Sequence, residues 1–318
     1  MIPAYNAERY LAGCLDSVIS QSVDDWELLI ADDGSTDSTG EIADRYALAD
    51  SRIKVIHLAN SGVSAARNCC MDKAKGRYLA FMDADDRLEK DYLKDLLDNA
   101  HTSGAEITQC SFSFVYDNGD RIPDPYAVSN VYHGTRGIMD GYFSGPAGDI
   151  RISAWAKLFR HDAFEKIRFD TDLKIYEDAY FTYLCCMKAD TVCAFDKPLY
   201  LYCQHGGSAM HSSLSANYRD YFEVFGKMQE DLQDNRHLSK AVSRRKAETS
   251  LWLMHLMIRE GRQSDLWELR RTALGESRRV FFSPAPLKLK VKLIGVALMP
   301  HLYFAMLSKK AVPDNEKV

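Results

Sequence analysis

The first hundred residues alternate between strand-like and helix-like patterns, and this alternation limits the fold more than any other feature of the sequence. Continuous apolar runs predict three short strands, at 26–31, 53–57 and 78–82. Segments with helical spacing of apolar residues, or with helix-capping residues at their start, lie at 8–20, 35–49, 61–75 and 89–100. Strand and helix in series predict a parallel sheet covered by helices, and therefore an α/β fold.

The pattern changes after this region, and we expect two parts of different character. Strand-like segments continue to about residue 203, whereas the chain is almost entirely helical from about Ser215. We therefore predict a first domain at 1–212 and a helical C-terminal region at 213–318. The opening Met-Ile-Pro-Ala-Tyr-Asn has the pattern of the last residues of a buried strand before a turn. Because a strand usually has about five or six residues, we expect that a few residues are missing upstream.

Composition and charge exclude several classes of protein. Hydrophobic residues make up 46% and charged residues 27% of the 318 residues, which is typical of a globular protein. The formal net charge of −5 argues against a nucleic-acid partner. The eight cysteines form no Cys-x-x-Cys motif, and the first residues do not have the pattern of a secretory signal. We therefore expect reduced thiols and a cytoplasmic protein.

Acidic residues follow two of the predicted strands, at positions that a core would not favour. Asp32-Asp33 comes after the strand at 26–31, and Asp83-Ala84-Asp85 after the strand at 78–82. In open parallel sheets, ligands bind at the carboxyl ends of the strands. Two carboxylates spaced by one residue suit a hard divalent cation, Mg²⁺ or Mn²⁺, that leaves room for a diphosphate. The alternative for either cluster is a solvated turn that caps the following helix.

Four motifs occur in order over about the first ninety residues. They are Pro3-Ala-Tyr-Asn, Asp32-Asp-Gly-Ser-Thr-Asp, Asn60-Ser-Gly-Val-Ser-Ala-Ala-Arg-Asn68 and Phe81-Met-Asp-Ala-Asp-Asp86. Together they resemble the signature of family 2 glycosyltransferases, which implies the GT-A fold, a Rossmann-like and mostly parallel sheet flanked by helices. The resemblance covers about the first two hundred residues, and the C-terminal third matches only in general character.

The resemblance implies a binding site for a UDP-sugar. The residues that it places around the nucleotide are Pro3, Tyr5, Asp33, Arg67, Asn68, Asp83 and Ala84. Asp33 would accept a hydrogen bond from the uracil N–H, Tyr5 would stack on the ring, and Asp83 would lie near the ribose. Asp85 would ligate the Mn²⁺ or Mg²⁺ ion through which the diphosphate binds.

The acceptor and the catalytic base belong to the second half of the predicted domain. Glu177-Asp178 opens an apolar helical segment, where the helix dipole stabilises an anion, and this dipole pairing alone is the structural alternative. The position resembles the Glu-Asp motif of the family, which implies Asp178 as the base and Glu177 as an orienting partner. By the same resemblance, Trp155 and Lys157 line the acceptor side, although a tryptophan is often part of a core.

A glycine-containing loop with His205 and Ser208 follows the last strand-like segment. It could close over the diphosphate or contribute a metal ligand, and a solvated loop is the alternative. The reaction that the resemblance implies is an inverting displacement. Asp178 would deprotonate an acceptor hydroxyl, which would attack the anomeric carbon from the face opposite UDP.

The tail at about 284–310 is basic and amphipathic. Residues 277–313 contain seven basic residues and no acidic one, whereas residues 1–276 carry a formal charge of −11. The uncharged stretch at 293–307 is shorter than the roughly 20 apolar residues that span a bilayer. We expect it to lie on an anionic membrane, which would make the protein peripheral at the inner face of the cell membrane. A helix packed on the protein's own core is the alternative.

These features predict a metal-dependent hexosyltransferase that moves a sugar from a UDP-sugar to a saccharide or lipid-linked saccharide acceptor in cell-surface polysaccharide synthesis. One alternative is a catalytically inactive family member that acts as a binding or assembly partner, but intact Asp33, Asp85 and Asp178 argue against it. The other is a sugar nucleotidyltransferase. That class needs a glycine-rich basic loop after the first strand, which this sequence does not supply.

Overall fold

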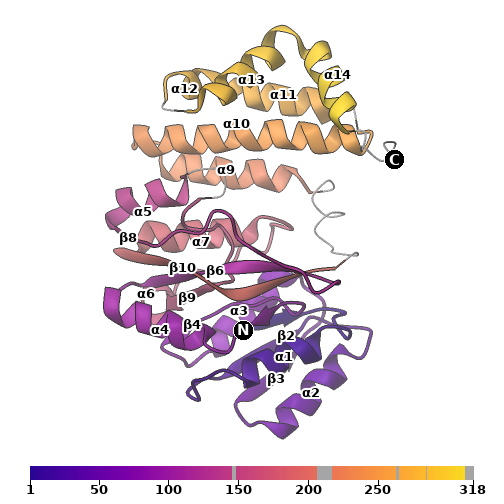
Figure 1. Ribbon diagram of the computed structural model, residues 1–318, viewed down its shortest axis with the longest axis vertical. Coiled ribbons are helices and arrows are strands. Elements are labelled where there is room, and N and C mark those ends of the chain that lie inside the picture. Colours follow the sequence, from indigo (N-terminus) through magenta and orange to yellow (C-terminus); the bar gives the residue numbers. More distant parts are fainter. Residues whose placement is uncertain (145–147, 206–216, 263–264, 284, 312–318) are drawn as a thin grey trace. The chain divides into compact units, whose positions relative to one another are not determined.

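The computed structural model describes residues 1–144, 148–205, 217–262, 265–283 and 285–311. The chain divides into two compact units, Met1–Ser208 and Ala209–Val318. The described strands all belong to the first unit, and the described part of the second unit is helical (Figure 1). The α/β fold and the C-terminal helices predicted from the sequence are therefore confirmed.

A parallel sheet of three strands forms from the first strand-like segments. Across the sheet, the order is β1 (Ile2–Ala4), β2 (Leu28–Asp32) and β3 (Ile53–His57). All five residues of β2 are buried, as its continuous apolar run predicts. Three helices pack around this part of the unit, α1 (Leu11–Ile19), α2 (Thr39–Ala49) and α3 (Val63–Lys73).

A second, mixed sheet occupies the rest of the first unit. Its order is β4 (Tyr78–Leu79), β9 (Lys157–Arg160), β6 (Ile107–Tyr116), β10 (Thr191–Gln204) and β5 (Arg87–Leu88), with β7 (Arg121–Pro123) beside β6 and β8 (Asn130–His133) beside β10. β6 and β10 run parallel, and the other pairs are antiparallel. The amino group of Met1 donates to the Ala80 carbonyl, and the Met82 N–H donates to the Met1 carbonyl, which connects the two sheets.

The second half of the unit differs in detail from the sequence-based expectation. The strand-like pattern of the sequence is broken between 195 and 199, but both segments, 192–195 and 199–203, belong to the single strand β10, whose register shifts around Pro198. Proline has no N–H, so it interrupts the hydrogen-bond ladder there without ending the strand. Its described residues also form the helices α4 (Tyr92–Ser103), α5 (Gly134–Tyr142), α6 (His161–Phe164) and α7 (Glu177–Lys188).

All eight cysteines are free, and seven of them are buried. Cys14 and Cys110 belong to the hydrophobic core between the sheets and their helices. The seven buried thiols are therefore small core residues.

The second unit is built around one long helix, α10 (Arg236–Arg259). Figure 1 shows α9 (Arg219–Asp231) on one side of it, and on the other side α11 (Leu266–Gly275), α12 (Ser277–Phe281) and α13 (Leu287–Leu298). Leu253 and Met257 of α10 share a core with Leu269 and Leu293. None of the described helices has the length and apolar character needed to cross a membrane.

The basic tail forms two helices, α13 and α14 (Pro300–Ala311). They separate at Pro300, because proline is accepted in the first turn of a helix but not in its interior. Leu289, Leu293 and Val296 of α13 are buried in the core of the unit. One face of the tail therefore packs on the protein itself, which is the alternative that the sequence left open.

Candidate active site

Asp33 connects the end of β2 to the loop that precedes α3. Its two carboxylate oxygens accept hydrogen bonds from the Ser61 and Gly62 N–H groups, each at 2.8 Å. Gly34 follows at φ 72°, and a side chain there would come within 2.8 Å of the Asn60 nitrogen, so the turn requires glycine. Each carboxylate oxygen can accept a second hydrogen bond, so Asp33 retains the capacity to bind a base N–H.

Tyr5 projects from the end of β1, with 52% of its surface exposed. The loop that carries it is fixed to the loop after β2, because Asn6 Oδ1 accepts from the Thr36 N–H at 2.9 Å. The Asn6 N–H donates in turn to Ser35 Oγ at 3.1 Å. An exposed ring on an anchored loop is suited to stacking on a flat ligand. Of the other predicted nucleotide contacts, Pro3 lies half-buried in β1.

Asp32, buried beside Asp33, pairs with His57 at the end of β3. Asp32 Oδ2 lies 2.9 Å from His57 Nδ1, and Asp44 Oδ1 lies 3.1 Å from His57 Nε2. The hydrogen bonds to Asp32 and then to Asp44 raise the pKa of His57 above its ordinary value of 6.5. The charged imidazole therefore stabilises the fold below pH 6.5, and this contribution is lost as the pH rises through the raised pKa.

We expect the substitution His57→Gln to destabilise the protein more at about pH 6 than at about pH 9. The ring is half exposed, so the free energy of unfolding should fall by no more than about 1 kcal/mol. Urea unfolding of both proteins across this range measures the difference. His133→Gln, at a ring that contacts the Thr191 hydroxyl, is the control. A loss of stability that does not change with pH would contradict the assignment.

The loop after β4 gathers three carboxylates, on Asp83, Asp85 and Asp86. Burial and then the charge of Asp83 raise the pKa of Asp85. Asp86 is fully buried and accepts hydrogen bonds from the Tyr200 hydroxyl and, at 2.8 Å, from the Cys203 N–H. Sequence reasoning assigned no role to Asp86, although the run of acidic residues directly before β5 contains it. Asp86 thus fixes the loop to β10, whereas a backbone hydrogen bond of Asp85 and the charge of His205 only partly offset the rise in the pKa of Asp85.

His205 lies close enough to Asp85 for its charge to oppose the rise in the pKa of that carboxyl. Its ring stacks on Tyr10 at 3.9 Å between centroids, and Nδ1 lies 3.2 Å from Asp117 Oδ1. Nε2 is buried, and none of the described residues forms a hydrogen bond with it. A carboxylate oxygen and an unpaired imidazole nitrogen are both ligands of Mn²⁺, so these residues fit a divalent cation that a diphosphate also binds. Ser208, predicted for the same loop, lies outside the described residues.

Within the described ranges, no group of three or more His, Cys, Asp or Glu side chains forms a metal site by itself. Ala84, between the two carboxylates of the predicted motif, is buried. Its predicted contact with a nucleotide stays a prediction.

Arg67 links this loop to the start of α7. It is buried, and its guanidinium donates to Glu177 Oε1 at 2.7 Å and to Asp83 Oδ1 at 2.9 Å. Asn68 holds a neighbouring segment, since its amide group exchanges two 2.8 Å hydrogen bonds with the backbone of Phe169. The structure thus shows both side chains in internal contacts, and their predicted contacts with a nucleotide stay predictions.

Asp178 lies half-buried in the first turn of α7, where its Oδ1 accepts from the Ala179 N–H at 2.7 Å. Burial and then the charge of the adjacent Glu177 raise the pKa of Asp178 to about 7, while the charge of Arg67 acts in the opposite direction. A carboxylate with a pKa near the working pH is suited to accept a proton from a substrate. The two adjacent carboxyl groups therefore differ. The charge of Glu177 is balanced by Arg67, whereas Asp178 can gain or lose a proton near pH 7.

Trp155 and Lys157, both predicted for the acceptor side, lie in different environments. Trp155 is partly exposed and stacks on Tyr200, with ring centroids 4.7 Å apart. Lys157 is fully buried, its amine donates to the Ser153 carbonyl at 2.7 Å, and burial lowers its pKa to about 7. Its amine thus contacts the protein's own backbone, and its predicted place on the acceptor side stays a prediction. Ala156 has φ 58°, which breaks the alternation that would place both side chains on one face.

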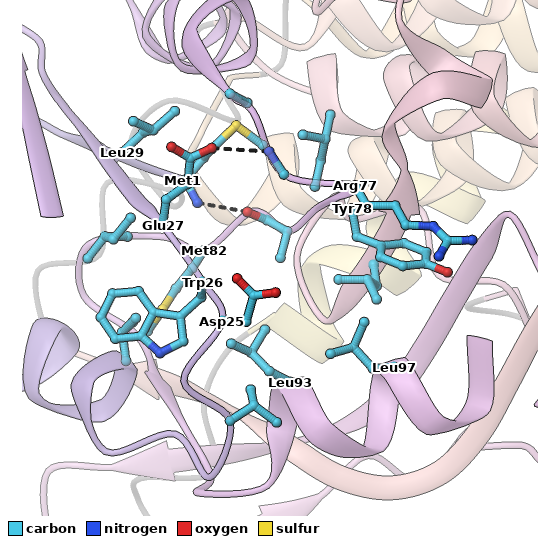
Figure 2. A pocket seen from close by; sticks show the side chains of 18 of the residues that line it. Met1, Asp25, Trp26, Glu27, Leu29, Arg77, Tyr78, Met82, Leu93 and Leu97 are labelled. Atoms are coloured by element: carbon cyan, nitrogen blue, oxygen red, sulfur yellow. Dashed lines mark hydrogen bonds between the residues drawn. The ribbon is translucent and has the colours of Figure 1, made fainter. Parts of the chain in front are cut away.

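A cavity of about 760 Å³ lies elsewhere in the first unit. Figure 2 shows that Trp26, Tyr78, Leu93 and Leu97 line it, together with Met1. None of the predicted site residues belongs to its lining. The candidate active site is therefore the group of strand-end loops and the start of α7, and not this cavity.

The α/β fold is that of a transferase of the GT-A type. It carries acidic loops at the ends of its strands and a pair of carboxyl groups at the start of α7. The family model described as glycosyl transferase family 2 matches residues 1–168, so the chain belongs to that family. The resemblance inferred from the four sequence motifs is confirmed.

Relatives extend the match beyond this region. The chain is 31% identical over 253 residues to the uncharacterized glycosyltransferase EpsJ of Bacillus subtilis, covering 73% of this chain and 72% of EpsJ. It is 30% identical over 190 residues to the minor teichoic acid biosynthesis protein GgaA of the same species, covering 57% of this chain and 41% of GgaA. The chain thus spans less than half the length of GgaA.

Among solved structures, S. aureus TarS 1–349 in complex with UDP-GlcNAc matches with a TM-score of 0.69. The match covers 97% of this chain and 89% of that one, at 20% sequence identity. At this identity the match shows a shared fold, which includes C-terminal helices.

Proposed function

We propose that this glycosyltransferase moves a sugar from a UDP-sugar to a saccharide or lipid-linked saccharide acceptor in cell-surface polysaccharide synthesis, with inversion at the anomeric carbon. The observation that carries the proposal is a continuous chain of charges from Asp83 through Arg67 and Glu177 to Asp178. It ties the loop proposed to bind the nucleotide to a carboxyl group suited to act as a base. The UDP-GlcNAc bound by TarS and the teichoic acid pathway of GgaA support the same assignment.

The donor would bind across the ends of β1, β2 and β4. Tyr5 offers its exposed ring to the uracil, and Asp33 offers acceptor sites to the ring N–H. Asp85 and His205 would hold Mn²⁺ or Mg²⁺, which neutralises negative charge on the departing diphosphate when it is bound. These residues come from separate loops, and the hydrogen bonds between Asn6 and Thr36 keep two of the loops together.

The acceptor would bind against α7. Asp178 takes the proton of the attacking hydroxyl, and Glu177, fixed by Arg67, keeps the first turn of α7 in position. The partly exposed ring of Trp155 is available to a sugar face. Attack from this side displaces UDP from the opposite face, which gives inversion.

A panel of UDP-sugars, incubated with the purified protein and Mn²⁺, tests the proposal. We expect at least one of them to release UDP, slowly by hydrolysis and faster when an acceptor saccharide is present. UDP binding without UDP release from any donor would favour the inactive family member. Binding of a nucleoside triphosphate with release of pyrophosphate would favour the nucleotidyltransferase.

The variant Asp85→Asn should need at least about tenfold more Mn²⁺ to bind UDP. Loss of a group that only supports a metal ligand already lowers metal affinity about tenfold or more, and loss of the ligand itself should lower it at least as much. Calorimetric titration of UDP at several Mn²⁺ concentrations measures this without reference to turnover. Asp25→Asn, at an exposed carboxylate away from the site, is the matched control. An unchanged Mn²⁺ requirement would remove Asp85 from the proposed metal site.

A further inference from the structure

Helix α13 has two apolar faces, and only one of them is buried. Leu289, Leu293 and Val296 pack into the core of the second unit. Leu287, Val291, Ile294 and Leu298 follow one another at spacings of four, three and four residues, so they form a row along one side of the helix. Their exposed fractions are 75, 57, 44 and 75%. A surface helix needs a single apolar face, so the second one requires a partner.

Exposed apolar residues also occur on either side of α13 in the sequence. Phe282 before it is 75% exposed, and Met299, Leu302 and Met306 after it are each more than half exposed. We call this set the apolar stripe, and its members are Phe282, Leu287, Val291, Ile294, Leu298, Met299, Leu302 and Met306. Eight exposed apolar side chains between residues 282 and 306 are more than the scattered exposed hydrophobic residues that are normal for a protein surface.

Positive charge borders the apolar stripe. At about 100° per residue, Lys288 and Lys292 lie to one side of the row on α13 and Lys290 to the other. Lys288 and Lys292 are exposed, whereas the Lys290 amine donates to the Ser283 carbonyl at 3.0 Å. No acidic residue occurs from 277 to 313. An apolar row flanked by lysines is the pattern of a helix that lies in the surface of a membrane.

We propose that α13 and α14 dock on an anionic lipid surface, with the apolar stripe at the boundary between headgroups and acyl chains and the lysines on lipid phosphates. Charge complementarity favours this occupant over a second copy of the chain. Two copies joined through the stripe would bring two segments of like charge together, each with seven basic residues and no acidic one. This proposal does not depend on the proposed sugar transfer.

Flotation of the full-length protein with lipid vesicles tests the proposal. We expect binding to phosphatidylcholine vesicles that contain about 30% phosphatidylglycerol, and little binding to phosphatidylcholine alone. Binding should weaken between about 0.1 and 0.5 M salt, since exposed charges are then screened. Equal binding to both kinds of vesicle, or to neither, would overturn the proposal.

Two variants separate the contributions of charge and of the apolar stripe. Lys288→Gln with Lys292→Gln should lower the partition coefficient about 30-fold, at roughly fivefold for each lysine near an anionic surface. Leu287→Gln with Val291→Gln and Leu298→Gln should lower it more than tenfold, because each side chain would leave water on binding. All five side chains are exposed, so the variants should fold as the parent does.

Matched controls come from the first unit. Lys73→Gln with Lys166→Gln removes two exposed lysines, and Leu48→Gln with Ile122→Gln and Val131→Gln removes three exposed apolar side chains. Neither control should change the partition by more than about twofold, because neither set belongs to the stripe or to the helices that carry it. If a control lowers binding as much as its counterpart, the proposal is wrong. It is also wrong if the protein is a dimer in solution and the triple variant at 287, 291 and 298 makes it a monomer.

Discussion

The substitution Asp178→Asn is expected to lower the rate of sugar transfer by about 10²- to 10⁴-fold, the usual contribution of a general base. The amide is nearly the same size as the carboxyl group but cannot take a proton from the acceptor hydroxyl. UDP binding should be unchanged, because the donor contacts come from other loops. The free energy of unfolding of the variant should be no lower than that of the parent. Above about pH 7 it should be higher than that of the parent, because the raised pKa of Asp178 shows that the fold disfavours the charged carboxylate.

Transfer kinetics and UDP titration on the same preparation measure both parts of this prediction. In the parent protein, kcat/KM should fall below about pH 7 as Asp178 becomes protonated. Asp172→Asn, at an exposed carboxyl group before α7, is the control and should retain full activity. Loss of transfer together with UDP binding would mean that Asp178 holds the donor and is not the base.

Removing the Arg67 guanidinium should have the second largest effect. Arg67→Met leaves the buried carboxylate of Glu177 without its partner, and breaking a buried ion pair in this way typically costs about 3–5 kcal/mol. Urea unfolding measures the loss. The exposed pair of Arg121 and Glu89 provides the control, since a surface ion pair contributes little and Arg121→Met should cost less than about 1 kcal/mol.

A second substitution distinguishes lost charge pairing from lost packing. Adding Glu177→Gln to Arg67→Met removes the unpaired charge, so most of the lost stability should return. Where enough folded Arg67→Met protein remains, the acidic limb of its activity profile should move to higher pH, because Arg67 normally lowers the pKa of Asp178. A double variant no more stable than the single one would indicate that packing around the arginine matters more than its charge.

Most strands and helices in the first hundred residues could be predicted because apolar runs and helix caps are local signals. The short strand β5 and the antiparallel pairing of β4 with β9 could not, because their partner strands lie far along the chain. The proximity of strand-end residues such as Asp33 and Tyr5 followed from the rule that parallel strands end at one edge. The position of Lys157 could not be predicted, because it depends on a positive φ at Ala156, a residue that seldom adopts one. The hydrogen bonds of Asn68 and Asp86 could not be predicted either, because their partners, Phe169 and Tyr200, lie about a hundred residues away in the sequence.

Tyr200 shows why the two halves of the site are difficult to redesign separately. Its hydroxyl donates to Asp86 and accepts from the Asp83 N–H at 3.3 Å, while its ring stacks on Trp155. A library that varies Trp155, which belongs to the proposed acceptor side, would therefore disturb the loop that carries Asp83 and Asp85. Engineering of acceptor choice should begin at positions that do not touch this tyrosine, and donor affinity should be screened alongside it from the first round.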